Sequence, residues 1–397
     1  MVLSEIGEFK NGLNFNQNDY GIGYPIINVK QLYQSRFATI ENLLGIKSDF
    51  AKKIDGYFVE KGDLLFVRGS MVPEGAGKLV MVNKFTHKTV FSGFIIRFRI
   101  TNKKIANPLF LTYLLRSTKY REMFVRIASG SVHSNMNQEI LGKIQVELPE
   151  ISTQIQITKI LDDIDTKIEL LQNQNKILEQ IIQSIFKSWF IDFDGVTEFE
   201  DSELGKIPKG WKIGMLGDVA ENIRDSINPK QITTNVKYIG LEHMPRERIF
   251  LDDWDNSSDS VMSNKFQFKK GDILFGKLRP YFRKVGISPI SGICSTDILV
   301  INPKDPLWLG FVLCIVSSEN FINFTDSASH GTRMPRTDWE TMKNFQVIIP
   351  DLKSMKKHNH VFSPILNRAI INVHLIHDLM QIRDSLLPKL MSGEIRV

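Results

Sequence analysis

The sequence is poor in cysteine and has no long apolar stretch. Only two of its 397 residues are cysteines, Cys294 and Cys314, and no CxxC spacing occurs, which excludes a disulfide scaffold and a cysteine-rich zinc site. No apolar run approaches the roughly 18–20 residues of a membrane span. The first residues lack the basic and apolar regions of a signal peptide. We therefore expect buried, reduced thiols in a cytoplasmic protein that has no contact with a membrane.

Patterns typical of catalysis are missing as well. The segment 69–79 departs from the phosphate-binding spacing GxxxxGK[ST], because Val72 and Leu79 stand where glycine and Ser/Thr are required. His358, Asn359 and His360 spell HNH, but they are contiguous at the head of a helix, so we expect solvated side chains there. No S-adenosylmethionine loop, PD…(D/E)xK nuclease pattern or metal-ligand cluster is found. We expect no catalytic residue, no metal and no cofactor in this chain.

An internal repeat is the main feature that is present. Residues 160–190 recur as residues 361–391 at one constant offset without a gap (361 − 160 = 201). Upstream of each copy, Lys61–Phe66 (KGDLLF) recurs as Lys270–Phe275 (KGDILF) (270 − 61 = 209). The two offsets differ because the intervening loops differ in length. Related scaffolds with different loops indicate two similar surfaces that bind two different targets.

The predicted fold class is α+β, with two similar mixed α/β domains separated by two long antiparallel helices that form a coiled coil. An apolar content of 42% is sufficient for a buried core in each domain. Short strand-like segments and one helical region per copy, such as the stretch from Pro108 to Arg126, support mixed domains. The predicted boundaries are 1–150 for the first domain, 151–192 for the first helix, 193–210 for a linker, 211–351 for the second domain, and 352–397 for the second helix and tail.

The first long helix carries an apolar residue at every seventh position and, with one exception, another four residues later. The stripe consists of Ile157, Ile164, Leu171, Leu178 and Ile185, and then of Leu161, Ile168, Asn175, Ile182 and Trp189. Such a seam predicts coiled-coil pairing, and the polar exception Asn175 is typical of a residue that selects one register. The expected partner is the second copy, from about Ser363 and Pro364 to a stop or kink at Pro388. A core helix of one compact domain is the alternative.

Cations gather in the loop that follows each Lys-Gly-Asp strand. The net charge of +6 is only weak support for a polyanionic partner, but residues 276–284 place four cations around Tyr281 and Phe282. Residues 68–78 are the matching loop, with Arg68 aligned with Lys277. Lys and Arg neutralise phosphates, and Arg also binds a guanine edge. A solvated loop is the alternative. The predicted DNA-binding residues are Arg68, Ser70, Lys78, Lys277, Arg279, Tyr281, Arg283 and Lys284.

A second pair of loops follows two aligned glycines, Gly130 and Gly331 (331 − 130 = 201). Both loops are rich in side chains able to bond base edges or phosphates, although ordinary protein surfaces have a similar composition. The further DNA-binding candidates from these loops are Ser131, His133, Arg333 and Arg336.

These features together resemble one known family, the specificity (S) subunits of Type I restriction–modification systems. The resemblance covers the whole chain and includes, besides the repeated Lys-Gly-Asp strands, the ends of both helices. Residues Ile185–Asp194 followed by Ile207–Trp211 are similar to the central junction of such subunits, and Leu386–Ile395 to their C-terminal end. Each motif is modest by itself, and their order makes the match fairly specific.

The resemblance implies a non-catalytic subunit whose two target-recognition domains each read one half of a bipartite, asymmetric DNA sequence. The helices would set the gap between the halves. Two adenine-N6 methyltransferase (M) subunits would bind, and restriction (R) subunits would join the full complex. S-adenosylmethionine, ATP and Mg²⁺ would belong to those partners. Trp189 and Phe190 are candidates for contact with the M subunits, and a purely intramolecular role is the alternative.

Two other functions are compatible with the same sequence features. One is a stand-alone, two-headed DNA-binding regulator, which would bind tightly and specifically without any methyltransferase. The other is a coiled-coil scaffold whose domains bind proteins, with negligible DNA affinity that does not respond to salt. A neighbouring gene for a methyltransferase with an Asn-Pro-Pro-Tyr/Phe motif would favour the S subunit.

Overall fold

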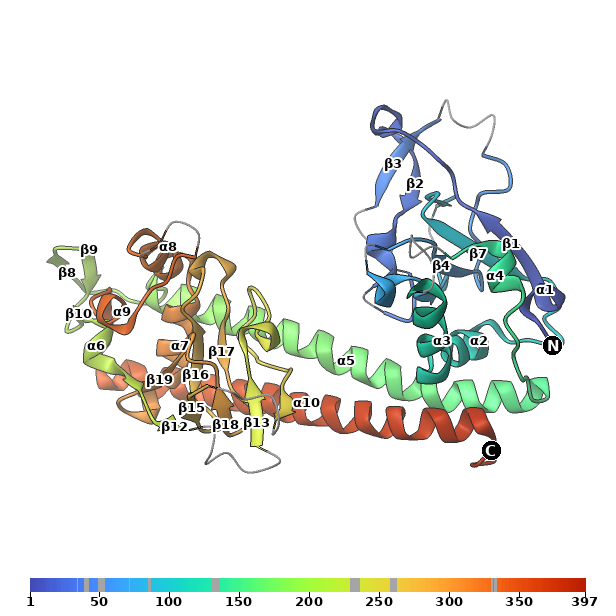
Figure 1. Ribbon diagram of the computed structural model, residues 1–397. Coiled ribbons are helices and arrows are strands. Elements are labelled where there is room, and N and C mark those ends of the chain that lie inside the picture. Colours follow the sequence, from blue (N-terminus) through green and yellow to red (C-terminus); the bar gives the residue numbers. More distant parts are fainter. Residues whose placement is uncertain are drawn as a thin grey trace. The chain divides into compact units, whose positions relative to one another are not determined.

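The computed structural model describes residues 1–33, 35–38, 43–48, 54–70, 72–84, 87–129, 136–228, 236–257, 263–329, 331 and 334–397. The chain divides into two compact units: unit 1 contains residues 1–166 and 380–397, and unit 2 contains residues 167–379. Each unit holds one mixed α/β domain together with parts of two long helices, α5 (Ile151–Phe190) and α10 (Leu352–Ser392), which are green and red in Figure 1. The domain boundaries expected from the sequence stay predictions.

In its described residues, the domain of unit 1 has two small sheets and four α-helices besides α5. The sheets follow the orders β1-β7-β4-β5 and β3-β2-β6. The elements are α1 (Leu3–Ile6), β1 (Gly7–Asn11), β2 (Gly23–Ile27), β3 (Leu44–Lys47), β4 (Leu64–Val67), β5 (Leu79–Met81), β6 (Val90–Phe91), β7 (Ile95–Ile100), α2 (Pro108–Arg116), α3 (Thr118–Ser129) and α4 (Gln138–Gly142).

Strand β4 is apolar at every position because both of its faces are covered. Leu64 and Phe66 belong to the core that also contains residues of α2, α3 and α5, whereas Leu65 and Val67 belong to a second cluster with Ile27 and other residues of the opposite face. Alternate side chains of a strand point to opposite faces, so a strand buried on both faces needs an unbroken apolar run. The Lys-Gly-Asp-Leu-Leu-Phe motif therefore marks a central strand.

Helix α2 begins where the sequence places an N-cap and a proline. The side chain of Asn107 accepts hydrogen bonds from the backbone N–H groups of Leu109 and Phe110, and Pro108 occupies the first turn. The predicted single helix from Pro108 to Arg126 is two helices, because Ser117 adopts an extended conformation between α2 and α3.

The domain of unit 2 repeats the four-stranded sheet, in the order β11-β19-β16-β17, and adds a five-stranded sheet, β12-β15-β18-β13-β14, and the pairs β10-β20 and β8-β9. Its elements are β8 (Phe199–Ser202), β9 (Gly205–Pro208), β10 (Lys212–Met215), α6 (Leu216–Val219), β11 (Ala220–Ile223), β12 (Ser226–Ile227), β13 (Val236–Ile239), β14 (Asp255–Ser257), β15 (Lys265–Phe268), β16 (Ile273–Gly276), β17 (Val285–Ile287), β18 (Gly292–Cys294), β19 (Ile298–Pro303), α7 (Leu309–Ser317), α8 (Glu319–Ser327), α9 (Trp339–Met342) and β20 (Gln346–Ile349).

Strand register aligns the two domains residue by residue. Leu64 of β4 pairs with Phe98 of β7, as its counterpart Ile273 of β16 pairs with Ile301 of β19. One position further along, Arg99 of β7 therefore corresponds to Asn302 of β19. The pairing of Glu8 with Arg99 and of Glu221 with Asn302 gives the same alignment. The duplication predicted from short motifs is thus a duplication of the sheet.

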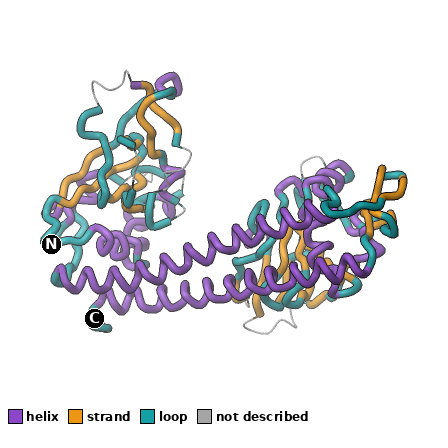
Figure 2. Tube along the Cα trace, turned by 180° about the vertical axis from the view of Figure 1, so that it is seen from behind, coloured by secondary structure: helices purple, strands orange, loops and turns teal. Residues whose placement is uncertain are grey.

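Helices α5 and α10 pair in antiparallel fashion, as predicted. In unit 1, Arg383 Nη1 lies 2.9 Å from Asp165 Oδ1. In unit 2, Asn372 Nδ2 donates to Asn175 Oδ1 at 2.8 Å, and Asn175 Nδ2 donates to the Ala369 carbonyl at 3.2 Å. From Asp165 to Asn175 the residue numbers on α5 increase, whereas those of their partners on α10 decrease from Arg383 to Asn372. The two helices therefore run in opposite directions (Figure 2). Asn175 is buried and its side-chain amide forms both hydrogen bonds with α10, and its role in selecting the register stays a prediction.

The predicted start of the second long helix, near Ser363 and Pro364, is wrong. Helix α10 begins at Leu352, where the Asp351 carboxylate accepts the backbone N–H of Ser354 at 2.6 Å. It continues through Pro364 and past Pro388. A proline removes one backbone hydrogen bond, but burial of an apolar helix face, here including Phe362, compensates for that loss.

His358 is not solvated as expected but lies in the core of unit 2, with 1% of its surface exposed. Its ring lies 4.6 Å from Phe190 and 4.5 Å from Phe362, measured between ring centroids. Burial lowers the pKa of His358 to about 4, so the ring is neutral at pH 7. Cys294 and Cys314 are free and buried, as predicted.

Among the described residues no single helix is both long and apolar enough to cross a membrane. Two consecutive helical segments, Pro306–Ser317 and Glu319–Ser327, reach that length and hydropathy only when taken together, and they are bent by 60°. The apolar residues of the first segment, from Phe311 to Val316, are buried in the core of unit 2.

Candidate nucleic-acid interface

The basic loop after β16 is a short, strained turn. Residues Pro280–Phe282 form a 3-10 turn, and the residues on either side of it, Arg279 and Arg283, have φ values of +52° and +51°. Non-glycine residues adopt this left-handed conformation rarely and at a cost of about 1 kcal/mol or more. The fold thus holds Arg279 and Arg283 in a backbone conformation that an unconstrained chain would avoid. Such strained residues are often found in functional loops.

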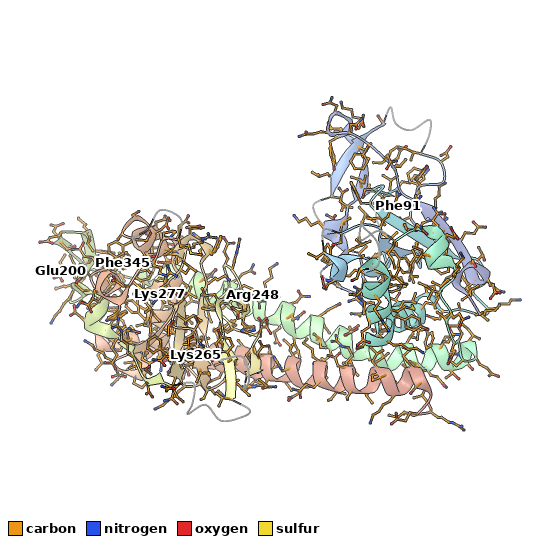
Figure 3. All side chains as sticks on the ribbon, in the orientation of Figure 1. Phe91, Glu200, Arg248, Lys265, Lys277 and Phe345 are labelled. Atoms are coloured by element: carbon orange, nitrogen blue, oxygen red, sulfur yellow. The ribbon has the colours of Figure 1, made fainter. Side chains whose placement is uncertain are left out.

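This basic loop is joined to the loop that contains Arg336. The Lys277 carbonyl accepts the N–H of Thr337 at 3.1 Å, and the N–H of Arg279 donates to the Pro335 carbonyl at 2.8 Å. Leu278 and Arg336 consequently form an antiparallel β-bridge. The predicted residues Lys277 (labelled in Figure 3), Arg279 and Arg336 therefore lie together, although they were chosen from separate loops.

Asp297 lies between the cations of the two loops. Its Oδ1 atom is 3.2 Å from Arg336 Nε and 4.0 Å from Lys277 Nζ. The backbone carbonyl of Asp297 also accepts the N–H of Lys277 at 2.9 Å. One carboxylate thus positions a cation from each loop and neutralises part of their charge. The sequence carries no signal for this role, because Asp297 is far from both loops along the chain.

The cations of this cluster differ in their bonding partners and in their exposure to solvent. Arg283 forms ion pairs with Glu319 at 3.3 Å and Glu247 at 3.8 Å, and the ammonium group of Lys284 donates to the Leu241 carbonyl. Burial, followed by the nearby Arg246 charge, lowers the pKa of Lys284. Arg283 and Lys284 therefore hold the loop in shape, whereas Tyr281 and Arg336 are about half exposed, at 48% and 46%.

Arg246 is a further candidate that the sequence analysis missed. Its guanidinium carbon lies 3.8 Å from the centroid of the Phe282 ring, a close cation–π contact. Arg279 approaches the same ring at 5.9 Å. A possible signal was present in the run Pro245-Arg246-Glu247-Arg248, but nothing in the sequence places that run beside residues 277–284.

Unit 1 has the same loop junction at the equivalent place. The Arg68 carbonyl accepts the N–H of Met136 at 2.7 Å, which corresponds to the bond between Lys277 and Thr337 in unit 2. Arg68 Nη1 also donates to the Gly93 carbonyl at 3.4 Å, and Ser70 Oγ accepts the N–H of Val72 at 3.3 Å. In unit 1 the described part of the second loop, at Met136, is thus joined to the loop that begins at Arg68.

The cation Lys78 is paired with an exposed aromatic ring. Lys78 Nζ lies 5.0 Å from the centroid of Tyr33, which is 45% exposed. Arg121 of α3 donates to the carbonyls of Glu74 and Ala76 at 2.8 and 3.2 Å and so stabilises the conformation of the loop that contains Lys78. The candidates Ser131, His133 and Arg333 lie outside the described residues.

Comparison with known proteins identifies the family. The Type I restriction modification DNA specificity domain matches residues 1–180 and again residues 208–380. The chain belongs to this family.

Individual specificity subunits resemble the chain over most of its length. The Type I restriction enzyme MjaIX specificity subunit of Methanocaldococcus jannaschii is 27% identical over 305 residues, which cover 72% of this chain and 69% of the relative. The HindI specificity subunit of Haemophilus influenzae is 25% identical over 411 residues, covering 85% and 87%. A crystal structure of an S subunit from M. genitalium superposes with a TM-score of 0.61 at 13% identity, covers 98% of this chain and 95% of that chain, and shows a shared fold.

Trp189 and Phe190, at the end of helix α5, are the residues of this Type I specificity chain that we expected to contact an M subunit. Phe190 is buried in unit 2, where its ring lies 5.8 Å from Trp211 and 5.1 Å from Phe311. This packing supports the intramolecular alternative for Phe190. Trp189 is half-buried, 5.8 Å from the ring of His358 and 5.0 Å from Lys357 Nζ. Its contact with an M subunit stays a prediction.

Proposed function

We propose that this chain is the non-catalytic DNA sequence-recognition subunit of a Type I restriction–modification complex. Each domain reads one half of a bipartite, asymmetric site on double-stranded DNA. Two adenine-N6 methyltransferase subunits bind the chain, restriction subunits join the full complex, and the chemistry, with S-adenosylmethionine, ATP and Mg²⁺, takes place in those partners.

The observation that supports this proposal is the duplicated junction between the cation-bearing loop after the Lys-Gly-Asp strand and a second loop. In unit 2 the junction has the half-exposed Tyr281 on one loop and the half-exposed Arg336 on the other, which offer a stacking surface and phosphate or base-edge contacts. In unit 1, Lys78 of the corresponding loop lies beside the exposed ring of Tyr33, a residue outside both loops. Equal scaffolds with unequal side chains are what two different half-sites require.

Co-expression with a methyltransferase subunit tests the proposal as a whole. We expect N6-methyladenine at a split sequence with a fixed gap across the host genome. Sequence-specific DNA binding by this chain without any methyltransferase would instead support a stand-alone regulator. Negligible DNA affinity of the assembled complex that does not change with salt would support a protein-binding scaffold and overturn the proposal.

Arg336→Ala is expected to lower the affinity of the complex for its DNA about tenfold to a hundredfold, since a good base contact contributes about 1–3 kcal/mol. Discrimination should relax only in the half-site read by unit 2. Binding to duplexes substituted one base pair at a time measures this. Lys206→Ala removes an exposed cation of the β8–β9 hairpin and should leave the affinity unchanged. An equal loss of base discrimination in both half-sites would contradict the assignment of Arg336 to the half-site that unit 2 reads.

Asp297→Asn is expected to strengthen binding to DNA of unrelated sequence and to reduce the preference for the correct site. The substitution removes the negative charge that now offsets part of Arg336 and Lys277. Up to one more phosphate would be neutralised, which steepens the slope of log K against log salt by about 0.9. Titrations of non-specific duplex at several salt concentrations measure the slope, and an unchanged slope would show that Asp297 does not moderate these cations.

A further inference from the structure

The carboxylate of the Lys-Gly-Asp turn has an arginine partner in unit 1. Arg99 Nε and Nη2 lie 2.7 Å from the two carboxylate oxygens of Asp63, and Arg99 Nη1 also pairs with Glu60. The neighbouring Arg97 donates to the carbonyls of Gly56 and Phe58 at 3.1 and 3.0 Å. Two guanidinium groups, those of Arg97 and Arg99, thus lie beside the Lys-Gly-Asp turn.

Neither guanidinium is present at the equivalent place in unit 2. The strand register puts Asn302 where Arg99 stands and Val300 where Arg97 stands. The turn itself is unchanged: Asp272 Oδ2 accepts the N–H of Lys269 at 2.7 Å, as Asp63 Oδ2 accepts the N–H of Glu60 at 2.7 Å. The aspartate is retained although its arginine is not.

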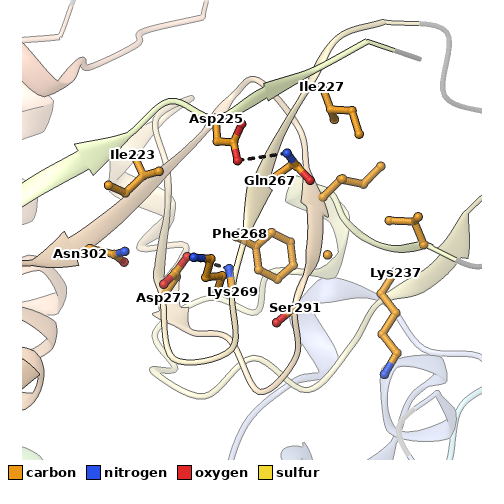
Figure 4. Close-up of a pocket in the computed structure, with 13 residues that line it drawn as sticks. Ile223, Asp225, Ile227, Lys237, Gln267, Phe268, Lys269, Asp272, Ser291 and Asn302 are labelled. Atoms are coloured by element: carbon orange, nitrogen blue, oxygen red, sulfur yellow. Dashed lines mark hydrogen bonds between the residues drawn. The ribbon is translucent and has the colours of Figure 1, made fainter. Parts of the chain in front are cut away.

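A pocket of about 680 Å³ occupies the place of the missing side chains. Asp272 and Asn302 line it together with Ile223, Ile227 and Phe268 (Figure 4). Its volume lies in the range of roughly 300–1,000 Å³ that is usual for small-molecule sites. A lining that combines apolar side chains with carboxylates and amides suits a ligand with an apolar stem and a positively charged head.

The polar groups of this pocket are incompletely satisfied by the protein. Asp272 is 8% exposed, and burial raises the pKa of its carboxyl. Within the described residues Asp272 forms no ion pair; besides the N–H of Lys269, its carboxylate accepts a hydrogen bond from the side chain of Asn302, whose buried oxygen has no hydrogen-bond partner there. A buried carboxylate without a cation is unfavourable, and an incoming cation would correct this.

Two lysines line the pocket without forming an ion pair with Asp272. Lys269, which replaces Glu60 of unit 1, has an exposed side chain, and its charge opposes the rise that burial causes in the pKa of Asp272 but does not cancel it. Lys237 Nζ lies 5.4 Å from the ring of Trp254. A second carboxylate, Asp225, lies on the pocket wall and accepts a hydrogen bond from Gln267 at 3.0 Å. The pocket therefore has acceptors at two places for a ligand with positive charge.

We propose that this pocket of unit 2 is a binding site for an alkylguanidinium group, with Asp272 as its carboxylate partner and Asn302 as a further acceptor. A guanidinium is preferred to an ammonium because its planar N–H groups match two acceptors at once, as Arg99 does for Asp63 in unit 1. The group can belong to a free alkylguanidine or to an arginine side chain of a bound protein subunit.

Equilibrium dialysis with agmatine, a free alkylguanidine, tests this site in the full chain. We expect one molecule bound per chain, at least tenfold weaker binding to Asp272→Asn, and no binding to Asn302→Arg, in which the chain supplies its own guanidinium. Asn302→Arg should also raise the unfolding midpoint of unit 2, which shows that the variant is folded. No binding to the wild type, or equal binding to Asp272→Asn, would overturn the proposal, as would equal affinity for a diamine of the same length, in which a second ammonium replaces the guanidinium of agmatine.

The arrangement in unit 1 provides a matched control. Replacing both arginines by their unit 2 counterparts, Arg97→Val with Arg99→Asn, should weaken unit 1 and create a second agmatine site, so the number of molecules bound per chain rises from about one to about two. An unchanged number in the folded double variant would overturn the equivalence on which the proposal depends. Repeating the dialysis with the methyltransferase complex distinguishes the sources: a partner arginine would exclude agmatine, whereas a site for a free ligand would still bind it.

Discussion

Asp165→Ala is expected to destabilise unit 1 by about 3 kcal/mol, because it leaves the buried Tyr113 hydroxyl without its acceptor and takes one of two carboxylate partners from Arg36 and from Arg383, which keep Asp162 and Asp384. Asp165 is 7% exposed. Its carboxylate accepts the Tyr113 hydroxyl at 2.7 Å and Arg383 Nη1 at 2.9 Å, and Arg36 Nε lies at 3.7 Å. The aspartate on α5 thereby links α2, the segment around Arg36, and α10.

Hydrogen exchange measured by mass spectrometry suits this prediction, because all five tryptophans lie in unit 2 and fluorescence would not report on unit 1. We expect protection in α2 to fall by more than about a hundredfold, which corresponds to roughly 3 kcal/mol. Asp163→Ala, at an exposed position of the same helix, is the control and should change little. Unaltered protection in Asp165→Ala would mean that the network is not needed for stability.

Acidification is expected to destabilise unit 2 through His358, by up to about 3 kcal/mol at pH 4. Burial lowers the pKa of this ring to about 4 in the folded chain, whereas an unfolded histidine titrates near 6.5. Between these values the unfolded state binds a proton that the folded state does not. Stability is therefore unaffected above about pH 6.5 and is lost progressively as the pH falls towards 4.

Urea unfolding followed by tryptophan fluorescence measures this effect, since every tryptophan belongs to unit 2. His358→Leu should remove most of the acid-dependent loss, because both ring nitrogens of His358 lack hydrogen-bond partners among the described residues. His360→Leu, at an exposed position two residues away, should retain it. The same pH dependence in the wild type and in His358→Leu would assign the loss to other groups.

The sequence predicted the repeated scaffold well because that information is local. Lys61–Phe66 and Lys270–Phe275 each form a turn followed by a strand buried on both faces, and such a strand must be apolar at every position. The seven-residue spacing likewise predicted the pairing of α5 with α10 and the buried Asn175. The proline rule failed at Pro364, where tertiary burial outweighs local preference.

The candidate interface was predictable only in part. Sequence chemistry selected Lys277, Arg279 and Arg336 from separate loops, and the fold brings them together. The roles of Asp297 and Arg246 could not be predicted, because each meets those cations only through contacts distant in the chain. The burial of His358 could not be predicted either, because one of the aromatic rings that cover it, Phe190, belongs to the other long helix.

By itself the sequence determined that this protein has two copies of one scaffold, held on a pair of long helices, with cations in corresponding loops. Those properties follow from periodicity, turn chemistry and repeated motifs, which act over a few neighbouring residues. Only the tertiary structure decided which cations remain exposed beside Asp297, and that the aspartate of one turn is paired with Arg99 while its counterpart Asp272 faces a pocket. Charge pairing and burial depend on which distant residues meet, and neighbours in the sequence do not determine that.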